Sequence, residues 1–111
     1  MLSRRRRLRT TEVAEVLRIG KNFRGRFLSA KVLGGSDDTI RVAAVVPKSL
    51  IKGAVSRNRV RRALYRAIAS LPEEKRGNKA ALIVFFVRAV PPPPLAPTFA
   101  GDVKKILSSL L

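Results

Sequence analysis

Apolar residues recur along this chain at two spacings, and the change between them separates predicted helices from predicted strands. Near the start, Val13, Val16 and Leu17 fall on one face at helical spacing. The segment from residue 10 to Gly20 is therefore predicted to be a short helix, and one of its first two threonines can cap the first turn.

Two segments with apolar side chains at every second position follow, over residues 27–33 and 39–46. This alternation is typical of strands with one buried face, and the cluster of Gly, Ser and Asp between them indicates a turn. We therefore expect the two strands to pair as a β-hairpin.

The clearest helical pattern covers residues 56–71, and Pro72 ends it. Its apolar stripe consists of Val60, Leu64, Ala67, Ile68 and Leu71. Residues 80–87 then form a continuous apolar run, AALIVFFV. Such a run indicates a central strand covered on both faces, although its periodicity alone also permits a buried helix.

Five prolines between residues 91 and 97 predict a stiff linker, which is more typical of a spacer than of a docking motif. A closing helix follows, with an apolar face formed by Phe99, Val103, Ile106, Leu107 and Leu110. The predicted order is α-β-β-α-β-α, with room for one more short strand. We expect an α+β sandwich in which the helices pack on a small central sheet.

Composition adds a class of partner to this picture. The chain has 111 residues, 24 Lys plus Arg, 7 Asp plus Glu and no His, so its formal net charge is +17. The length predicts a single domain over residues 1–111, and an apolar fraction of 46% is too high for a disordered basic tail. This positive excess favours polyanionic partners, nucleic acid before an anionic membrane surface.

Missing residue types and segments exclude other classes. Without Cys or His, the chain has no disulfide framework, thiol nucleophile or Ser-His-Asp triad. Gly20 and Gly25 have P-loop spacing, but the Lys and Ser or Thr that the motif needs do not follow. No segment approaches the ~20 apolar residues of a membrane span, and no apolar region follows the basic N-terminus. We therefore expect a soluble, cytoplasmic protein.

Much of the positive charge lies in two short stretches. Five arginines lie within residues 1–9, which we interpret as a basic, mobile arm that either contacts RNA or is simply solvated. Five more lie within residues 57–66, where Arg59, Arg62 and Arg66 oppose the apolar stripe of the predicted helix. Their planar guanidinium groups suit pairing with phosphates, and this helix contains no acid that would neutralise them.

The chain offers little for phosphodiester hydrolysis by the protein itself. General acid–base catalysis of that reaction needs His or a carboxylate cluster that holds a metal ion. There is no His, and the tempting acidic pair, Asp37 and Asp38, lies in a turn where solvated carboxylates are the common case. We therefore predict no catalytic and no metal-binding residue in this chain.

Residues 42–67, VAAVVPKSLIKGAVSRNRVRRALYRA, resemble the bacterial ribonuclease P protein component. That family has a strand, a Ser-Lys-Lys type loop, a Gly-x-Ala-Val run and an Arg-Asn-Arg helix with further basic residues. The matching segments are Val42–Val46, Pro47–Ser49, Gly53–Val55 and Arg57–Arg59, then Arg61 and Arg62. The order of the remaining elements also fits, so the resemblance covers nearly the whole chain.

The resemblance implies both a function and a fold. Members of this family are accessory subunits of a ribonucleoprotein that removes the 5′ leader from precursor tRNA. The implied partners are the catalytic RNA subunit and precursor tRNA, with no protein partner evident. The RNA carries out the hydrolysis and holds most of the Mg²⁺ that it requires. The implied fold contains a left-handed βαβ crossover, against the right-handed default.

Roles for individual residues follow from the same resemblance. The implied contacts with the RNA subunit are Lys48, Arg57, Asn58, Arg59, Arg61, Arg62 and Arg66. The implied contacts with the leader are Val13, Leu17, Phe27, Lys31 and Tyr65. The family often has aromatic residues at the first two of these positions, where this chain has aliphatic ones. Tyr65 stands where another arginine is common, and its ring can stack on a base or pack inward.

Two other interpretations stay open at this point. A structural RNA-binding protein, such as a small ribosomal protein, would share the charge without a role in tRNA cleavage. A basic membrane-surface protein fits less well, because the amphipathic helix from Phe99 carries only Lys104 and Lys105 as cations.

Overall fold

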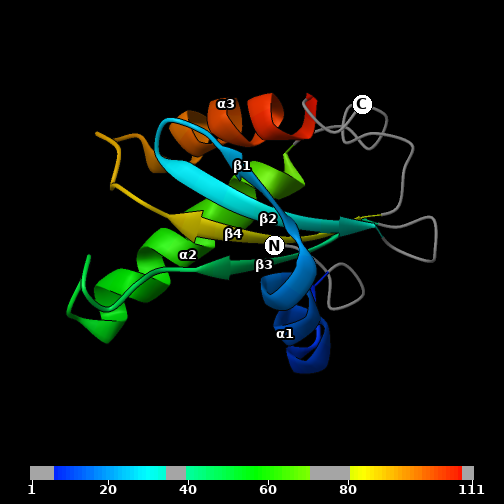
Figure 1. Ribbon diagram of the computed structural model, residues 1–111. Coiled ribbons are helices and arrows are strands. Elements are labelled where there is room, and N and C mark those ends of the chain that lie inside the picture. Colours follow the sequence, from blue (N-terminus) through cyan, green and yellow to red (C-terminus); the bar gives the residue numbers. More distant parts are fainter. Residues whose placement is uncertain (1–6, 35–39, 71–80, 109–111) are drawn as a thin grey trace.

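The computed structural model describes residues 7–34, 40–70 and 81–108, and these form three helices and four strands (Figure 1). In chain order the elements are α1 (Thr10–Ile19), β1 (Lys21–Arg24), β2 (Leu28–Gly34), β3 (Ile40–Val45), α2 (Ala54–Ala69), β4 (Ala81–Val87) and α3 (Leu95–Ser108). The predicted α+β class is confirmed, and the additional short strand is β1.

The four strands form one sheet in the order β1-β2-β4-β3. β2 pairs antiparallel with both β1 and β4, whereas β3 runs parallel to β4. The predicted hairpin between the strands that are now β2 and β3 is therefore wrong, because β4 lies between them. Instead, β3, α2 and β4 form the βαβ unit that the family resemblance implies.

β4 is the central strand that its continuous apolar run predicts. Ile83 and Phe85 are buried in the core cluster on one face of the sheet, and Val84 is buried on the other. Phe85 pairs with Ala30 of β2 and with Ala44 of β3. Small residues on both sides of its ring leave room for the phenyl group in that row of the sheet.

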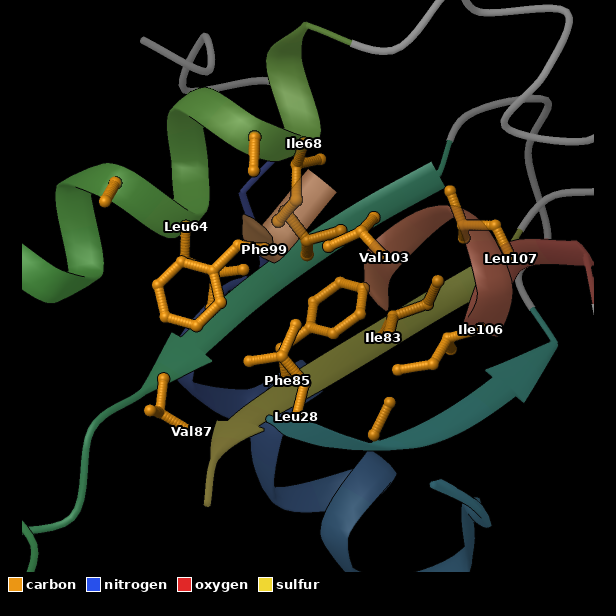
Figure 2. Packing of buried hydrophobic residues seen from close by; sticks show 14 of the residues in the cluster. Leu28, Leu64, Ile68, Ile83, Phe85, Val87, Phe99, Val103, Ile106 and Leu107 are labelled. Atoms are coloured by element: carbon orange, nitrogen blue, oxygen red, sulfur yellow. The ribbon is translucent and has the colours of Figure 1, made fainter. Parts of the chain in front are cut away.

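The main core lies between the sheet and the layer formed by α2 and α3 (Figure 2). The apolar stripes predicted for these helices are buried there as Val60, Leu64, Ala67, Ile68, Phe99, Val103, Ile106 and Leu107. Their last predicted positions, Leu71 and Leu110, lie outside the described residues. Because the stripe of α2 faces the sheet, the opposite side of the helix faces solvent.

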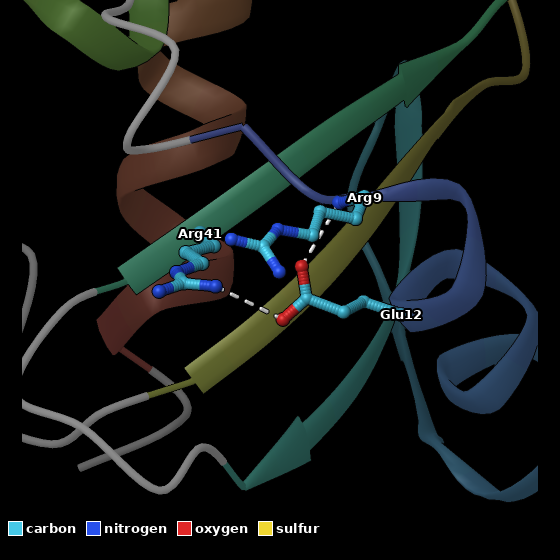
Figure 3. A network of polar contacts seen from close by, with 3 residues as sticks. All are labelled: Arg9, Glu12 and Arg41. Carbon is cyan, nitrogen blue, oxygen red and sulfur yellow. Dashed lines mark hydrogen bonds and ion pairs between the residues drawn. The ribbon is translucent and has the colours of Figure 1, made fainter.

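α1 packs against β2 and β4 on the other face of the sheet and buries Val16 there. Its N-cap residue is Arg9 and not a threonine as predicted, and the Glu12 carboxylate accepts the Arg9 N–H at 2.9 Å. Glu12 also pairs with Arg41 of β3 at 3.1 Å (Figure 3). Since one carboxylate contacts both the helix start and a strand, it fixes where α1 begins over the sheet.

The end of the basic arm predicted over residues 1–9 is paired with the sheet. Arg7 forms a parallel bridge with Val42, and the Leu8 N–H donates to the Val42 carbonyl at 2.9 Å. The rest of the predicted arm, residues 1–6, lies outside the described residues. These contacts place Arg7 and Leu8 at the outer edge of β3.

The proline-rich linker is shorter than the predicted 91–97. α3 already begins at Leu95, so Pro97 lies in the first turn of the helix. The N–H groups of a first turn have no partner within the helix, and a proline there therefore removes no helical hydrogen bond.

Candidate nucleic-acid interface

The outer face of α2 carries a row of cationic side chains. Arg59, Arg62 and Arg66 are exposed opposite the buried stripe, as their spacing predicts. Asn58 is exposed beside them, and its side-chain oxygen accepts a hydrogen bond from Nη1 of Arg61 at 2.6 Å. This contact aligns the half-buried Arg61 along the helix and leaves its other N–H groups for a ligand.

No carboxylate of the described residues neutralises this face. α2 itself contains no acid, and no ion pair in the described ranges involves its arginines. Without a bound ligand, arginines one helical turn apart repel each other, and a bound polyanion would offset this repulsion. The surface is therefore suited to phosphates, which pair with guanidinium groups in a bidentate geometry.

Arg57 differs from the other arginines of α2, because its side chain turns back toward the preceding loop. Its Nη1 donates to the carbonyl oxygens of Ile51 at 3.0 Å and Lys52 at 2.7 Å. These bonds close the loop that leads into α2. Arg57 thus has a structural contact in addition to the RNA contact that the resemblance implies.

The loop between β3 and α2 adds cations next to the start of the helix. The N–H groups of Leu50 and Ile51 both donate to the Pro47 carbonyl, which folds the loop into a turn. Lys48 and Lys52 are exposed on it. The first turn of α2 has no acid, so these lysines lie near the positive end of the helix without compensation.

Three of the residues predicted to contact the leader lie together on the α1 face of the sheet. Val13 is half-buried, and Leu17, one turn later, is 38% exposed. The Nζ of Lys31 on β2 donates to the Leu17 carbonyl at 2.9 Å. The structure thus brings Val13, Leu17 and Lys31 into one surface of aliphatic groups beside a cation.

The other two predicted leader contacts lie elsewhere. Phe27 packs against the core cluster on the α2 and α3 side of the sheet. Tyr65 packs against the same cluster from α2, and its hydroxyl accepts the Ala44 N–H at 3.2 Å. The structure does not bring these two rings together with Val13, Leu17 and Lys31.

One polar residue in the structure was not identified from the sequence. Asp102 of α3 is buried, and its carboxylate accepts the backbone N–H groups of Arg26, Phe27 and Leu28. The sequence did contain one indication of this role: an acid stands three positions after Phe99, on the apolar face of the closing helix. An acid in that position needs hydrogen-bond donors from another segment.

The described part of the chain holds neither a cluster of metal ligands nor a helix that could cross a membrane. Within residues 7–34, 40–70 and 81–108, no three side chains of the His, Cys, Asp and Glu types come together as metal ligands. The Asp37 and Asp38 pair falls outside these ranges. Over the same part of the chain, no helix is long and apolar enough to cross a membrane.

Comparison with known proteins gives a consistent match along nearly the whole chain. The model of the family described as Ribonuclease P matches residues 2–107. The ribonuclease P protein component of Pseudanabaena sp. is 36% identical over 110 residues, which are 97% of this chain and 93% of that protein.

Solved structures of ribonuclease P proteins have the same fold. The Staphylococcus aureus protein aligns with a TM-score of 0.73 at 18% identity, covering 95% of this chain and 94% of that one. The Thermotoga maritima protein aligns with a TM-score of 0.67 at 21% identity, with the same 95% and 94% coverage.

Proposed function

This chain belongs to the ribonuclease P protein family, the accessory subunits of the endoribonuclease that matures the 5′ end of tRNA, and from this we propose how it acts. The outer face of α2 binds the catalytic RNA subunit, and the α1 side of the sheet contacts the 5′ leader of precursor tRNA. The RNA subunit carries out the hydrolysis.

The observation that carries this proposal is the row of exposed arginines on α2 without a carboxylate partner in the described residues. Arg59, Arg62 and Arg66 follow one side of the helix, and Arg61 is aligned beside them by Asn58. Guanidinium groups in such a row can pair with successive phosphates of a folded RNA. Lys48 and Arg57 extend this surface to the first turn of α2.

The leader contact rests on the surface formed by Val13, Leu17 and Lys31. The aliphatic side chains offer apolar area to an unstacked base, and the lysine offers a charge for the adjoining phosphate. Aromatic stacking would be stronger than these aliphatic contacts, so leader binding through α1 is expected to be modest. Phe27 and Tyr65 are further candidates, at other places on the surface.

The chemistry is assigned to the RNA because the members of this family are accessory subunits, and the composition and the described residues of this chain support that assignment. The sequence contains no His, and the described residues form no cluster of three metal-ligating side chains. Mg²⁺ is therefore proposed to be bound mainly by the RNA subunit. Processing of precursor tRNA also indicates that the protein acts in the cytoplasm.

Reconstitution tests this proposal directly. The purified chain is combined with a bacterial-type catalytic RNA and a 5′-labelled precursor tRNA at low Mg²⁺ concentration. We expect no cleavage by the chain alone and a sharp rise in leader removal over the RNA alone, because the cations of the protein offset phosphate repulsion. A variant with Arg59 and Arg62 replaced by Ala should stimulate less, and Lys104→Ala on the exposed side of α3 is the matched control.

The results that would contradict this proposal are as clear as those that would support it. Unchanged cleavage in the presence of the wild-type chain would contradict the proposed role. If the chain then also co-sedimented with ribosomal subunits, a structural ribosomal protein would be the better interpretation.

A further inference from the structure

The turn between β1 and β2 is held by a side chain from the far end of the sequence. Oδ1 of Asp102 accepts the N–H of Arg26 at 2.9 Å, and its Oδ2 accepts those of Phe27 at 2.7 Å and Leu28 at 2.8 Å. Three consecutive backbone N–H groups therefore converge on one buried carboxylate. Hydrogen bonds to an ionised acceptor are among the strong ones, so the turn is fixed relative to α3.

Gly25 allows this close approach. A Cβ at position 25 would lie 2.7 Å from Oδ2 of Asp102 and 2.8 Å from its Cγ. Both distances are too short for a real contact, and the carboxylate is held by three hydrogen bonds. Any larger residue at this position would displace the carboxylate from the N–H groups that it accepts.

The fixed turn also orders the end of β4. The Phe27 carbonyl accepts the N–H groups of Arg88 at 2.8 Å and Ala89 at 3.3 Å. Arg24, Arg26 and Arg88 are all exposed around this turn, and we call these three residues the turn patch. The Arg26 guanidinium lies over the Phe27 ring, 5.2 Å from its centroid, which restricts that side chain further.

The charge of the turn patch is not neutralised by the acid beneath it. Asp102 uses both oxygens to accept backbone N–H groups, and none of the ion pairs in the described ranges includes a residue of the turn patch. A carboxylate placed here for charge balance would contact a guanidinium group. This one instead organises the backbone and leaves three cations facing solvent.

The topology puts the turn patch at the same end of the sheet as the start of α2. β2 begins opposite the last residue of β4, and β3 ends beside the same part of β4 (Figure 1). The β3–α2 loop with Lys48 and Lys52 therefore leaves the sheet about 10 Å, or two strand spacings, from the start of β2, and one strand spacing from the end of β4, which precedes Arg88. The basic β1–β2 turn and the basic β3–α2 loop therefore lie on either side of the end of β4.

We propose that the turn patch is a second phosphate-binding surface for RNA, separate from the outer face of α2, and that Asp102 is its positioning residue. This inference rests on the proposed function, because it takes RNA as the partner. The ligand chemistry is a phosphodiester backbone, which either the catalytic RNA subunit or the precursor tRNA can supply. Asp102 touches no RNA and acts through the backbone of Arg26 and Phe27.

The salt dependence of RNA binding distinguishes the loss of a phosphate contact from the loss of folded protein. The dissociation constant of the full chain is measured over a range of salt concentrations with three probes: catalytic RNA alone, precursor tRNA with its leader, and mature tRNA without it. Arg26→Ala should reduce the slope of log K against log salt by roughly one unit for the RNA that contacts the patch. Arg24→Ala should act in the same way, and Lys104→Ala should leave every slope unchanged.

Asp102→Asn tests the positioning role. The amide is the same size but accepts fewer N–H groups, so the turn loosens while Arg26 stays in the protein. We expect the slope to fall as it does for Arg26→Ala, and the double variant to lose no more than either single one. A merely structural residue would lower the fraction of folded protein, which changes binding amplitude but not the slope.

Gly25→Ala provides a second way to displace the carboxylate if Asp102→Asn folds poorly. Unchanged slopes for Arg24→Ala and Arg26→Ala with all three probes would overturn the proposal, whatever Asp102 variants do. If wild-type chain failed to bind catalytic RNA or to stimulate cleavage, the proposed function itself would fail. Normal stimulation with unchanged slopes would remove only the turn patch.

Discussion

The phenolic oxygen of Tyr65 accepts the N–H of Ala44 at 3.2 Å, so a side chain of α2 satisfies a backbone group on the outer edge of β3. β3 is an edge strand of the sheet, and Val42, two residues before Ala44, pairs with Arg7 near the end of the basic arm. Unpaired groups on an edge strand invite pairing with other chains. Arg7, Leu8 and Tyr65 together cover successive outward-facing positions of this edge.

Tyr65→Phe removes this hydroxyl while keeping the ring against the core. The Ala44 N–H then loses its partner in a half-buried site, which should lower the free energy of unfolding by about 1 kcal/mol. Urea denaturation followed by circular dichroism measures the change. Because the ring is retained, leader affinity should be unchanged, and an equally stable variant would show that solvent replaces the hydroxyl at no cost.

Asp102→Ala should be much more destabilising than Tyr65→Phe. It leaves the three N–H groups of Arg26, Phe27 and Leu28 without their charged acceptor, and each such bond is worth about 1.5–3 kcal/mol. We expect a decrease of about 3 kcal/mol or more in the free energy of unfolding, measured by urea denaturation. Thr98→Ala, which removes a partly exposed hydroxyl from the same helix, is the comparison, and similar decreases for the two would contradict the assigned role.

The contrast between α2 and Asp102 shows what local patterns can and cannot reveal. The buried stripe and the exposed arginines of α2 both depend on spacing within one helix, so the sequence predicted them before any tertiary contact was known. Asp102 and Phe27 are separated by 75 positions, and no local pattern connects them. An acid on the apolar face of a helix indicates a buried partner without identifying it.

The error in strand pairing has a similar origin. Alternation told which face of each strand is buried but not which strand lies beside it, and the turn-forming residues between 34 and 39 favoured a hairpin. The continuous apolar run of β4 argued against this hairpin. A strand that is buried on both faces is expected inside a sheet, with another strand on each side. β4 has β2 on one side and β3 on the other.

Replacement of Arg59 and Arg62 by Ala tests the outer face of α2. Both side chains are exposed, so the fold should be unaffected, and binding to catalytic RNA should weaken. The slope of log K against log salt should fall by roughly one unit for each phosphate that no longer has a cationic partner. Replacing both residues by Lys should restore most of the slope but less of the affinity, because Lys lacks the bidentate fork. An unchanged slope would remove this face from the interface.

Leu17→Phe should strengthen contact with the leader. Leu17 is 38% exposed on α1 beside the Lys31 amine, so a larger ring can be accommodated without repacking the core. A phenyl group at this place can stack on a base, and base–aromatic stacking is worth about 1–3 kcal/mol in other proteins. We expect tighter binding of precursor tRNA with a leader and no change for mature tRNA. Ile19→Phe adds the same ring to an exposed position near the end of α1 and is the matched control. An equal gain from both variants, or a gain with mature tRNA, would show that the ring acts non-specifically and that Leu17 does not face the leader.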